Sequence, residues 1–149
     1  MHALVPLLLV LDQVTKLWAL AHLSPVPKPV LGDLLYLTLV HNTGAAFGLL
    51  EGRSWVLGWI SLLVGTWLLL LLNRKRPPLT ALGLGMVAAG ALGNAIDRLG
   101  RGYVVDFIDL GTNIHWVANF PVFNVADSLL TVGVAILLLA GGRSRSKRG

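Results

Sequence analysis

One stretch of the sequence, residues 55–72, contains no charged side chain. At a rise of 1.5 Å per residue, an α-helix of this length spans about 27 Å, close to the thickness of the hydrocarbon core of a bilayer. Residues 3–23, 79–97 and 124–141 form three more apolar segments of similar length. Charged residues make up only 13% of the chain, whereas soluble domains carry about 25%. We therefore predict a single membrane domain, an all-α bundle of four transmembrane helices.

Two basic clusters indicate the orientation of this bundle. Residues 74–76 follow the second span and residues 143–148 follow the fourth, and both are rich in Lys and Arg. Because such clusters mark cytoplasmic loops, both termini are expected in the cytoplasm, with residues 24–54 and 98–123 outside. The basic charge is thus a topology signal, and no nucleic-acid partner is expected. The tail, residues 142–149, is expected to be disordered. The chain has no cysteine, which excludes disulfides, thiolate metal sites and a cysteine nucleophile.

The external segments favour extended structure. Residues 34–41 are rich in strand-forming side chains and precede an Asn-Thr-Gly turn, and residues 102–108 have a similar composition. We expect a small β-sheet on the outer membrane surface, with residues 49–55 along the interface. In the third span, small residues recur every four positions, which allows another helix to approach closely. These residues are Ala81, Gly85, Ala89 and Gly93.

Carboxylates are placed unusually in this sequence. Five of the seven lie within or beside apolar segments: Asp12, Asp97, Asp106, Asp109 and Asp127. A charged side chain in hydrocarbon costs at least about 2.5–3.5 kcal/mol on insertion scales, so such residues indicate a function by default. The predicted topology brings Asp97, Asp106 and Asp127 to the outer side. Asp109 is the least informative of the five.

The spacing of these residues suggests acid–base chemistry. Asn94 and Asp97 are three residues apart, as are Asn124 and Asp127, so each amide shares a helix face with a carboxylate that it can orient. Two neighbouring carboxyl groups share one proton. The ionised group can then draw a proton from water while the protonated group polarises a peptide carbonyl. The pattern is consistent with an aspartic peptidase.

Each of these features also has a structural interpretation. Asp12 and Lys16, four residues apart, can form a buried ion pair that holds helices in register. Asp97 and Arg98 can form a helix-end salt bridge, and Asp127 can be an acid favoured by the helix dipole. The residues alone therefore leave two alternatives open, a small proton- or ion-coupled transporter and a non-catalytic membrane scaffold. A zinc peptidase is poorly supported, because the histidines are scattered and no His-Glu-x-x-His occurs.

Five motifs in order decide between these interpretations. They are Asp12-Gln-Val-Thr-Lys16, Asn42-Thr-Gly-Ala-Ala-Phe47, Gly90-Ala-Leu-Gly-Asn-Ala-Ile-Asp-Arg98, Val104-Val-Asp-Phe-Ile-Asp109 and Phe123-Asn-Val-Ala-Asp-Ser128. Together they resemble the lipoprotein signal peptidase (signal peptidase II) family. The resemblance implies an aspartic endopeptidase of the bacterial inner membrane, with four spans and an external β-cradle. It also implies that the substrates are diacylglyceryl-modified prolipoproteins, cut just before the lipidated cysteine. We expect a monomer surrounded by membrane lipids, with no metal or other cofactor.

The resemblance also implies roles for individual residues. Asp106 and Asp127 correspond to the catalytic dyad, and Asp97 is the main rival for a place in it. The residues expected to support the site or bind substrate are Asp12, Lys16, Asn42, Gly44, Asn94, Asp97, Arg98 and Asn124. The chain departs from the family pattern in two places: Ala91 follows Gly90 where a second glycine is common, and residues 111–120 lengthen the connection between the dyad motifs.

Overall fold

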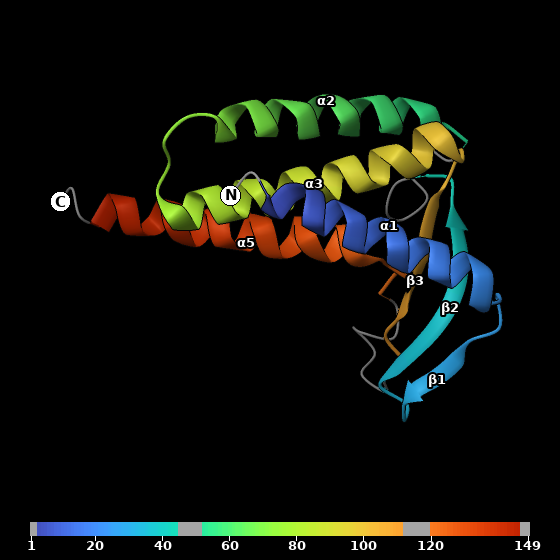
Figure 1. Ribbon diagram of the computed structural model, residues 1–149. Helices are drawn as coiled ribbons and strands as arrows, with labels where there is room; N and C mark the ends of the chain where they lie inside the picture. Colours follow the sequence, from blue (N-terminus) through green and yellow to red (C-terminus); the bar gives the residue numbers. More distant parts are fainter. Residues whose placement is uncertain (1–2, 45–51, 112–119, 147–149) are drawn as a thin grey trace.

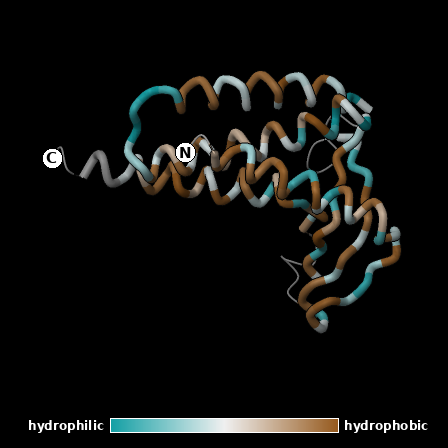
Figure 2. Tube along the Cα trace, viewed as in Figure 1, coloured by the Kyte–Doolittle hydropathy of each residue, from teal (hydrophilic) through white to brown (hydrophobic). Residues whose placement is uncertain are grey.

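The structure is a computed structural model that describes residues 3–44, 52–111 and 120–146, with side chains described to residue 142. Four helices in the described chain are long and apolar enough to cross a membrane. They are α1 (Leu4–His22), α2 (Ser54–Leu72), α3 (Pro78–Gly100) and α5 (Val125–Ser146). Figure 1 shows them side by side, and in Figure 2 their length is largely hydrophobic while the loop between α2 and α3 is hydrophilic. The predicted four-span bundle is confirmed.

Helix α3 is the centre of the bundle. In its apolar window 67% of the residues are buried, against 17–22% in the other three helices. It packs against α1, α2 and α5 (Figure 1). The other helices therefore present most of their surface outward, as expected for side chains that face lipid.

Small residues on α3 allow this close packing. The predicted stripe faces α1: Ala89 packs against Val5, and a Cβ at Gly93 would collide with the Asp12 carboxylate. A second stripe, which the sequence analysis did not identify, faces α5. There a Cβ at Gly90 would lie 2.5 Å from the carbonyl oxygen of Ala126. Two helices can thus approach α3 on different faces, as small residues permit in membrane bundles.

The predicted small β-sheet is also confirmed. Strands β1 (Lys28–Leu31), β2 (Leu35–Asn42) and β3 (Val104–Asp109) form an antiparallel sheet in the order β1-β2-β3. The sequence analysis did not single out β1. Figure 1 shows the sheet projecting sideways from the end of the bundle where α1 and α3 end and α5 begins. β3 is anchored there because its Val105 and Phe107 are buried against Ala19 of α1.

The structure corrects two boundaries. α3 continues to Gly100, three residues past the predicted end, because Arg101 closes the last turn through its N–H and its ion pair with Asp97. α5 continues through Ser146, so the disorder predicted for residues 142–146 is wrong. Residues 147–149 of the tail lie outside the described residues, as do residues 49–51 of the predicted interfacial segment, whereas Ser54 already begins α2.

Candidate active site

A cleft of about 280 Å³ lies where the sheet meets the C-terminal end of α3 and the N-terminal end of α5. Its lining comes from α3, strands β2 and β3, the segment that leads into α5, and α5 itself. The lining residues are Asn42, Asn94, Arg98, Val104, Asp106, Phe120, Pro121, Val122, Phe123, Asp127, Leu130 and Thr131. Asp106 and Asp127 are thus the two carboxylates in one cleft, whereas Asp97 is absent from its lining.

Asp106 enters the cleft from β3. Its Oδ2 accepts a hydrogen bond from Asn42 Nδ2 at 3.0 Å, and its Oδ1 accepts one from Asn124 Nδ2 at 2.7 Å. Burial, and to a lesser degree the negative charge of Asp127, raises the pKa of Asp106 to about 7, although both amide hydrogen bonds oppose the rise. Near neutral pH this carboxyl group can therefore hold or release a proton.

Asp127 is fixed at the start of α5 by a reciprocal capping arrangement. The Asp127 backbone N–H donates to Asn124 Oδ1 at 2.9 Å, and the Asn124 N–H donates to Asp127 Oδ2 at 3.2 Å. The second oxygen, Oδ1, accepts from Asn94 Nδ2 at 2.8 Å. The helix start is held against β3 because Phe123 pairs with Ile108 through backbone hydrogen bonds. Local capping therefore places Asp127 beside the carboxyl group from the sheet.

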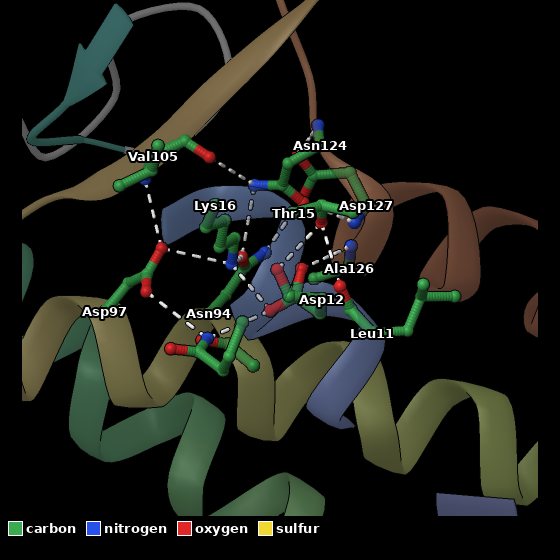
Figure 3. Close-up of polar contacts among 12 residues, drawn as sticks. Leu11, Asp12, Thr15, Lys16, Asn94, Asp97, Val105, Asn124, Ala126 and Asp127 are labelled. Atoms are coloured by element: carbon green, nitrogen blue, oxygen red, sulfur yellow. Dashed lines mark hydrogen bonds and ion pairs between the residues drawn. The ribbon is translucent and has the colours of Figure 1, made fainter. Parts of the chain in front are cut away.

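A second polar group, the buried charge cluster, lies deeper and consists of Asp12, Lys16, Asp97 and Arg101. The Lys16 Nζ lies 2.9 Å from Asp12 Oδ2 and 3.0 Å from Asp97 Oδ2, and all three side chains are fully buried (Figure 3). Arg101 forms a further ion pair with Asp97. The remaining oxygen of Asp12 accepts from the Ala126 N–H at 2.9 Å, which ties α1 to α5. Two carboxylates are thus balanced by two cations, as buried charges require.

The structural interpretation of Asp12 and Lys16 is therefore supported, and that of Asp97 with Arg98 is replaced. The ion-pair partners of Asp97 are Lys16 on α1 and Arg101, one helical turn further along the chain. Asp97 also accepts a hydrogen bond from the Val105 N–H at 3.0 Å, and so fixes the start of β3. The remaining carboxylate, Asp109, accepts from Thr38 at 3.4 Å and does not line the cleft.

Asn42, Gly44 and Arg98 connect the sheet to α3 at the cleft. The Gly44 N–H donates to Asn42 Oδ1 at 3.0 Å, which leaves the Asn42 amide nitrogen to donate to Asp106. Arg98 donates to the Gly44 carbonyl at 3.3 Å and lies close enough to Asp127 and Asp106 to interact with their charges. The rest of this motif, residues 45–47, lies outside the described residues.

Two residues of this region were missed by the sequence analysis. Gln13 donates to Asp12, to the Gly93 carbonyl and to Asp97. Arg101 bonds to Gln13 at 3.3 Å in addition to its ion pair with Asp97. The spacing of four residues between Asp97 and Arg101 was a usable signal for that pair, whereas nothing in the sequence links Gln13 to α3. Within the described residues, no three His, Asp or Glu side chains lie close enough to ligate a metal ion.

The fold and cleft together define a class: a multi-pass membrane protein with two neighbouring carboxyl groups at one end of its helical bundle. Residues 4–141 match the family described as signal peptidase (SPase) II, Peptidase_A8. The chain belongs to this family, whose members are aspartic peptidases.

Individual relatives agree with this assignment. The chain is 46% identical to the lipoprotein signal peptidase of Syntrophomonas wolfei, over 89% of this chain and 86% of that protein. It is 44% identical to the lipoprotein signal peptidase of Caulobacter vibrioides, over 93% and 83% of the two chains. Among solved structures, a bacterial membrane enzyme determined by the in meso method at 2.3 Å resolution superposes with a TM-score of 0.86 at 32% identity, covering 99% of this chain and 90% of that one.

These findings decide between the alternatives left open by the residues. A transporter of the expected kind would have discontinuous helices in an inverted repeat. Each of the four long helices in the described chain is continuous. Family membership favours an enzyme over both the transporter and the scaffold.

Proposed function

We propose that Asp106 and Asp127 are the catalytic dyad of this peptidase. The observation that supports the proposal most is that both side chains line one cleft at the end of the bundle, each accepting hydrogen bonds from fixed amides. The raised pKa of Asp106 allows the pair to share a single proton near neutral pH. Asp97 is unsuitable because its oxygens are already used by Lys16, Arg101 and β3.

The dyad would act by general acid–base catalysis. The ionised carboxylate takes a proton from a water molecule as the water oxygen bonds to the carbonyl carbon of the scissile peptide. The protonated carboxyl group donates its proton to the carbonyl oxygen, which gives a tetrahedral diol. The C–N bond then breaks as a proton passes to the leaving nitrogen, and the new carboxyl and amino termini separate. No other reactant is needed.

We infer that the substrate is a prolipoprotein whose cysteine carries diacylglyceryl, and that cleavage occurs just before this cysteine. The relatives are lipoprotein signal peptidases, and the position of the cleft fits a substrate held in the bilayer by two acyl chains. The cleft is bordered by the apolar side chain of Leu130 on α5 and by those of Phe120, Val122 and Phe123. Asn42 on β2 lies beside it, so the sheet is placed to align an extended substrate backbone.

A cleavage assay with purified protein tests this proposal. Matched peptides would carry the same lipobox sequence with either a diacylglyceryl cysteine or an unmodified one. We expect efficient cleavage before the lipidated cysteine only, and no cleavage by Asp127→Asn at equal protein concentration. Equal cleavage of both peptides would contradict the lipid requirement, and a cut elsewhere would contradict the assigned position.

We further propose that the protein is a monomer of the bacterial inner membrane with both termini in the cytoplasm. The even number of spans supports termini on one side, and the cleft lies at the end of the bundle opposite the α2–α3 loop (Figure 1). That loop carries the basic cluster at residues 74–76, so the cleft is expected at the outer face. Reporters fused after residues 76 and 148 should read inside, and one within residues 24–44 outside. An external reading after residue 76 would overturn this topology.

A further inference from the structure

Three asparagine amides contact the proposed dyad, and each must present its nitrogen rather than its oxygen to a carboxylate. The amide of Asn42 is held by the Gly44 N–H, which donates to its Oδ1 at 3.0 Å, so the other two remain to be explained. An asparagine side chain offers an acceptor at one end and donors at the other, so its rotation by half a turn reverses what the carboxylate meets. Asn124 donates to Asp106 at 2.7 Å and Asn94 donates to Asp127 at 2.8 Å. Something in the structure must fix each amide in this orientation.

The orientation of Asn124 is fixed by the backbone. Its Oδ1 accepts the N–H of Asp127 at 2.9 Å as part of the helix cap. A reversed amide would place its NH2 group against that N–H and lose the cap. Asn124 therefore needs no help from a charged side chain.

Among the described residues, no backbone N–H donates to Asn94 Oδ1, and this oxygen instead accepts from the Lys16 Nζ at 3.0 Å. In the described parts of the chain, one other donor reaches this oxygen, Asn124 Nδ2 at the longer distance of 3.3 Å. Lys16 is fully buried, and an ammonium group can only donate. Its three N–H groups are matched by Asn94 and by the two carboxylates of the buried charge cluster. Lys16 therefore holds the acceptor end of the Asn94 amide.

We propose that Lys16 is a positioning residue for the dyad: through Asn94 it holds an N–H donor on Asp127 and so favours the ionised form of that carboxylate. This rests on the proposal that Asp106 and Asp127 form the dyad. The path consists of two hydrogen bonds, Lys16 Nζ to Asn94 Oδ1 and Asn94 Nδ2 to Asp127 Oδ1. Within the described residues, the charges acting on the dyad are Arg98 from α3, the two carboxylates on each other, and Lys16 itself, whose charge lowers the pKa of Asp106. This direct effect of the Lys16 charge on Asp106 is separate from the hydrogen-bonded path to Asp127.

This role is separate from the ion pairing of Lys16, and a charge-balanced variant distinguishes them. Removing Lys16 alone would leave Asp12 and Asp97 without their shared cation. In Asp12→Asn/Lys16→Met one charge of each sign is removed, and the asparagine oxygen at position 12 can still accept the Ala126 N–H. Asp12→Asn alone is the matched control, because it keeps Lys16 beside Asn94. Asp12→Asn/Lys16→Gln restores an N–H donor at position 16 without a charge.

The test compares the pH dependence of kcat for these three variants on a lipidated lipobox peptide. In Asp12→Asn/Lys16→Met (the Met variant), we expect the acidic limb of the plot of kcat against pH to lie about one pH unit higher than in Asp12→Asn. This is the size expected for one lost hydrogen bond to an ionised carboxylate. KM should remain unchanged, and the Gln variant should resemble Asp12→Asn. An unchanged limb in the Met variant, or equal shifts in the Met and Gln variants, would overturn the proposal. A purely structural Lys16 would change thermal stability and leave the limb in place.

Asn94→Leu keeps the test decisive if the Met variant does not accumulate. It should move the acidic limb up by itself, as the Met variant is expected to do. An unchanged limb in Asn94→Leu would mean that the hydrogen bond from Asn94 does not favour the ionised form of Asp127, which overturns the proposal. Substantial cleavage by Asp127→Asn would instead refute the dyad, so the two failures are distinguishable.

Discussion

The buried charge cluster and the proposed dyad use the same residue type in opposite ways. In the cluster, two carboxylates face two cations and all distances to Lys16 are close to 3 Å. In the dyad, within the described parts of the chain, the carboxylates have amide partners and form no ion pair. A cation fixes a carboxylate in its ionised form, whereas an amide orients the group and leaves its proton exchangeable. The difference teaches that the partners of an aspartate, more than its burial, separate a structural role from a catalytic one here.

The largest expected effect comes from removing proton exchange in the dyad. Asp106→Asn and Asp127→Asn keep the side-chain shape, and each should lower kcat by about 10²–10⁴-fold, the usual contribution of general acid–base catalysis. Because the two groups act as one unit, the double variant should be hardly worse than either single variant. Cleavage of a lipidated lipobox peptide measures all three.

Asp97→Asn is the control that tests the comparison itself. It removes a carboxylate of the buried charge cluster, so it should lower the unfolding temperature. Its loss of kcat should be smaller than that of the dyad variants. An inactive but stable Asp97→Asn, together with an active Asp106→Asn, would reassign the dyad to Asp97 and Asp127.

The next effect is on stability and concerns Asp12. Asp12→Ala removes one of the two anions paired with Lys16 and leaves the Ala126 N–H without its acceptor. Breaking a buried pair in this way costs about 3–5 kcal/mol. We expect a clear fall in the thermal unfolding temperature in detergent, with little change in KM. For Asp12→Asn we expect a smaller fall in the unfolding temperature. An Asp12→Ala protein of full stability and no activity would assign this residue to the substrate site.

A smaller effect on stability is expected for Gly93→Ala, at the point where α3 approaches the buried charge cluster. A Cβ there would collide with the Asp12 carboxylate, which cannot move without loosening its contacts to Lys16 and Ala126. Overpacking of this kind costs about 1–3 kcal/mol. Gly85→Ala on the same helix is the matched control, since its Cβ would meet Val5 at an ordinary 3.5 Å. Thermal unfolding should separate the two variants, and equal unfolding temperatures would mean that the cluster adjusts freely.

The spans and the clustering of the carboxylates could be predicted from the sequence more completely than the partners of each carboxylate. Apolar length and basic clusters locate a helix because the bilayer imposes both. Spacing of three or four residues relates side chains on one helix, so Asp12 with Lys16 was predictable. Contacts between helices, such as Lys16 with Asn94, depend on how closely α1 approaches α3, and no local pattern encodes that distance. The roles assigned to Asp106 and Asp127 came from the family resemblance, because Asp127 alone also has a structural explanation and Asp97 was a rival for a place in the dyad.

The last effect is the part of the pH dependence of stability that Asp106 contributes. The pKa of Asp106 is raised to about 7 in the folded protein from an ordinary value of 3.8. Between these values the folded state binds more protons than the unfolded state, so stability should fall as pH rises from about 4 to 7 and level off above. Asp106→Asn should lose this part of the slope, whereas Asp12→Asn should keep it. Unfolding temperatures of the three proteins in one detergent at pH 5 and pH 8 measure the difference. If wild type and Asp106→Asn respond equally to pH, Asp106 is ionised throughout, and the proton shared by the dyad must reside on Asp127.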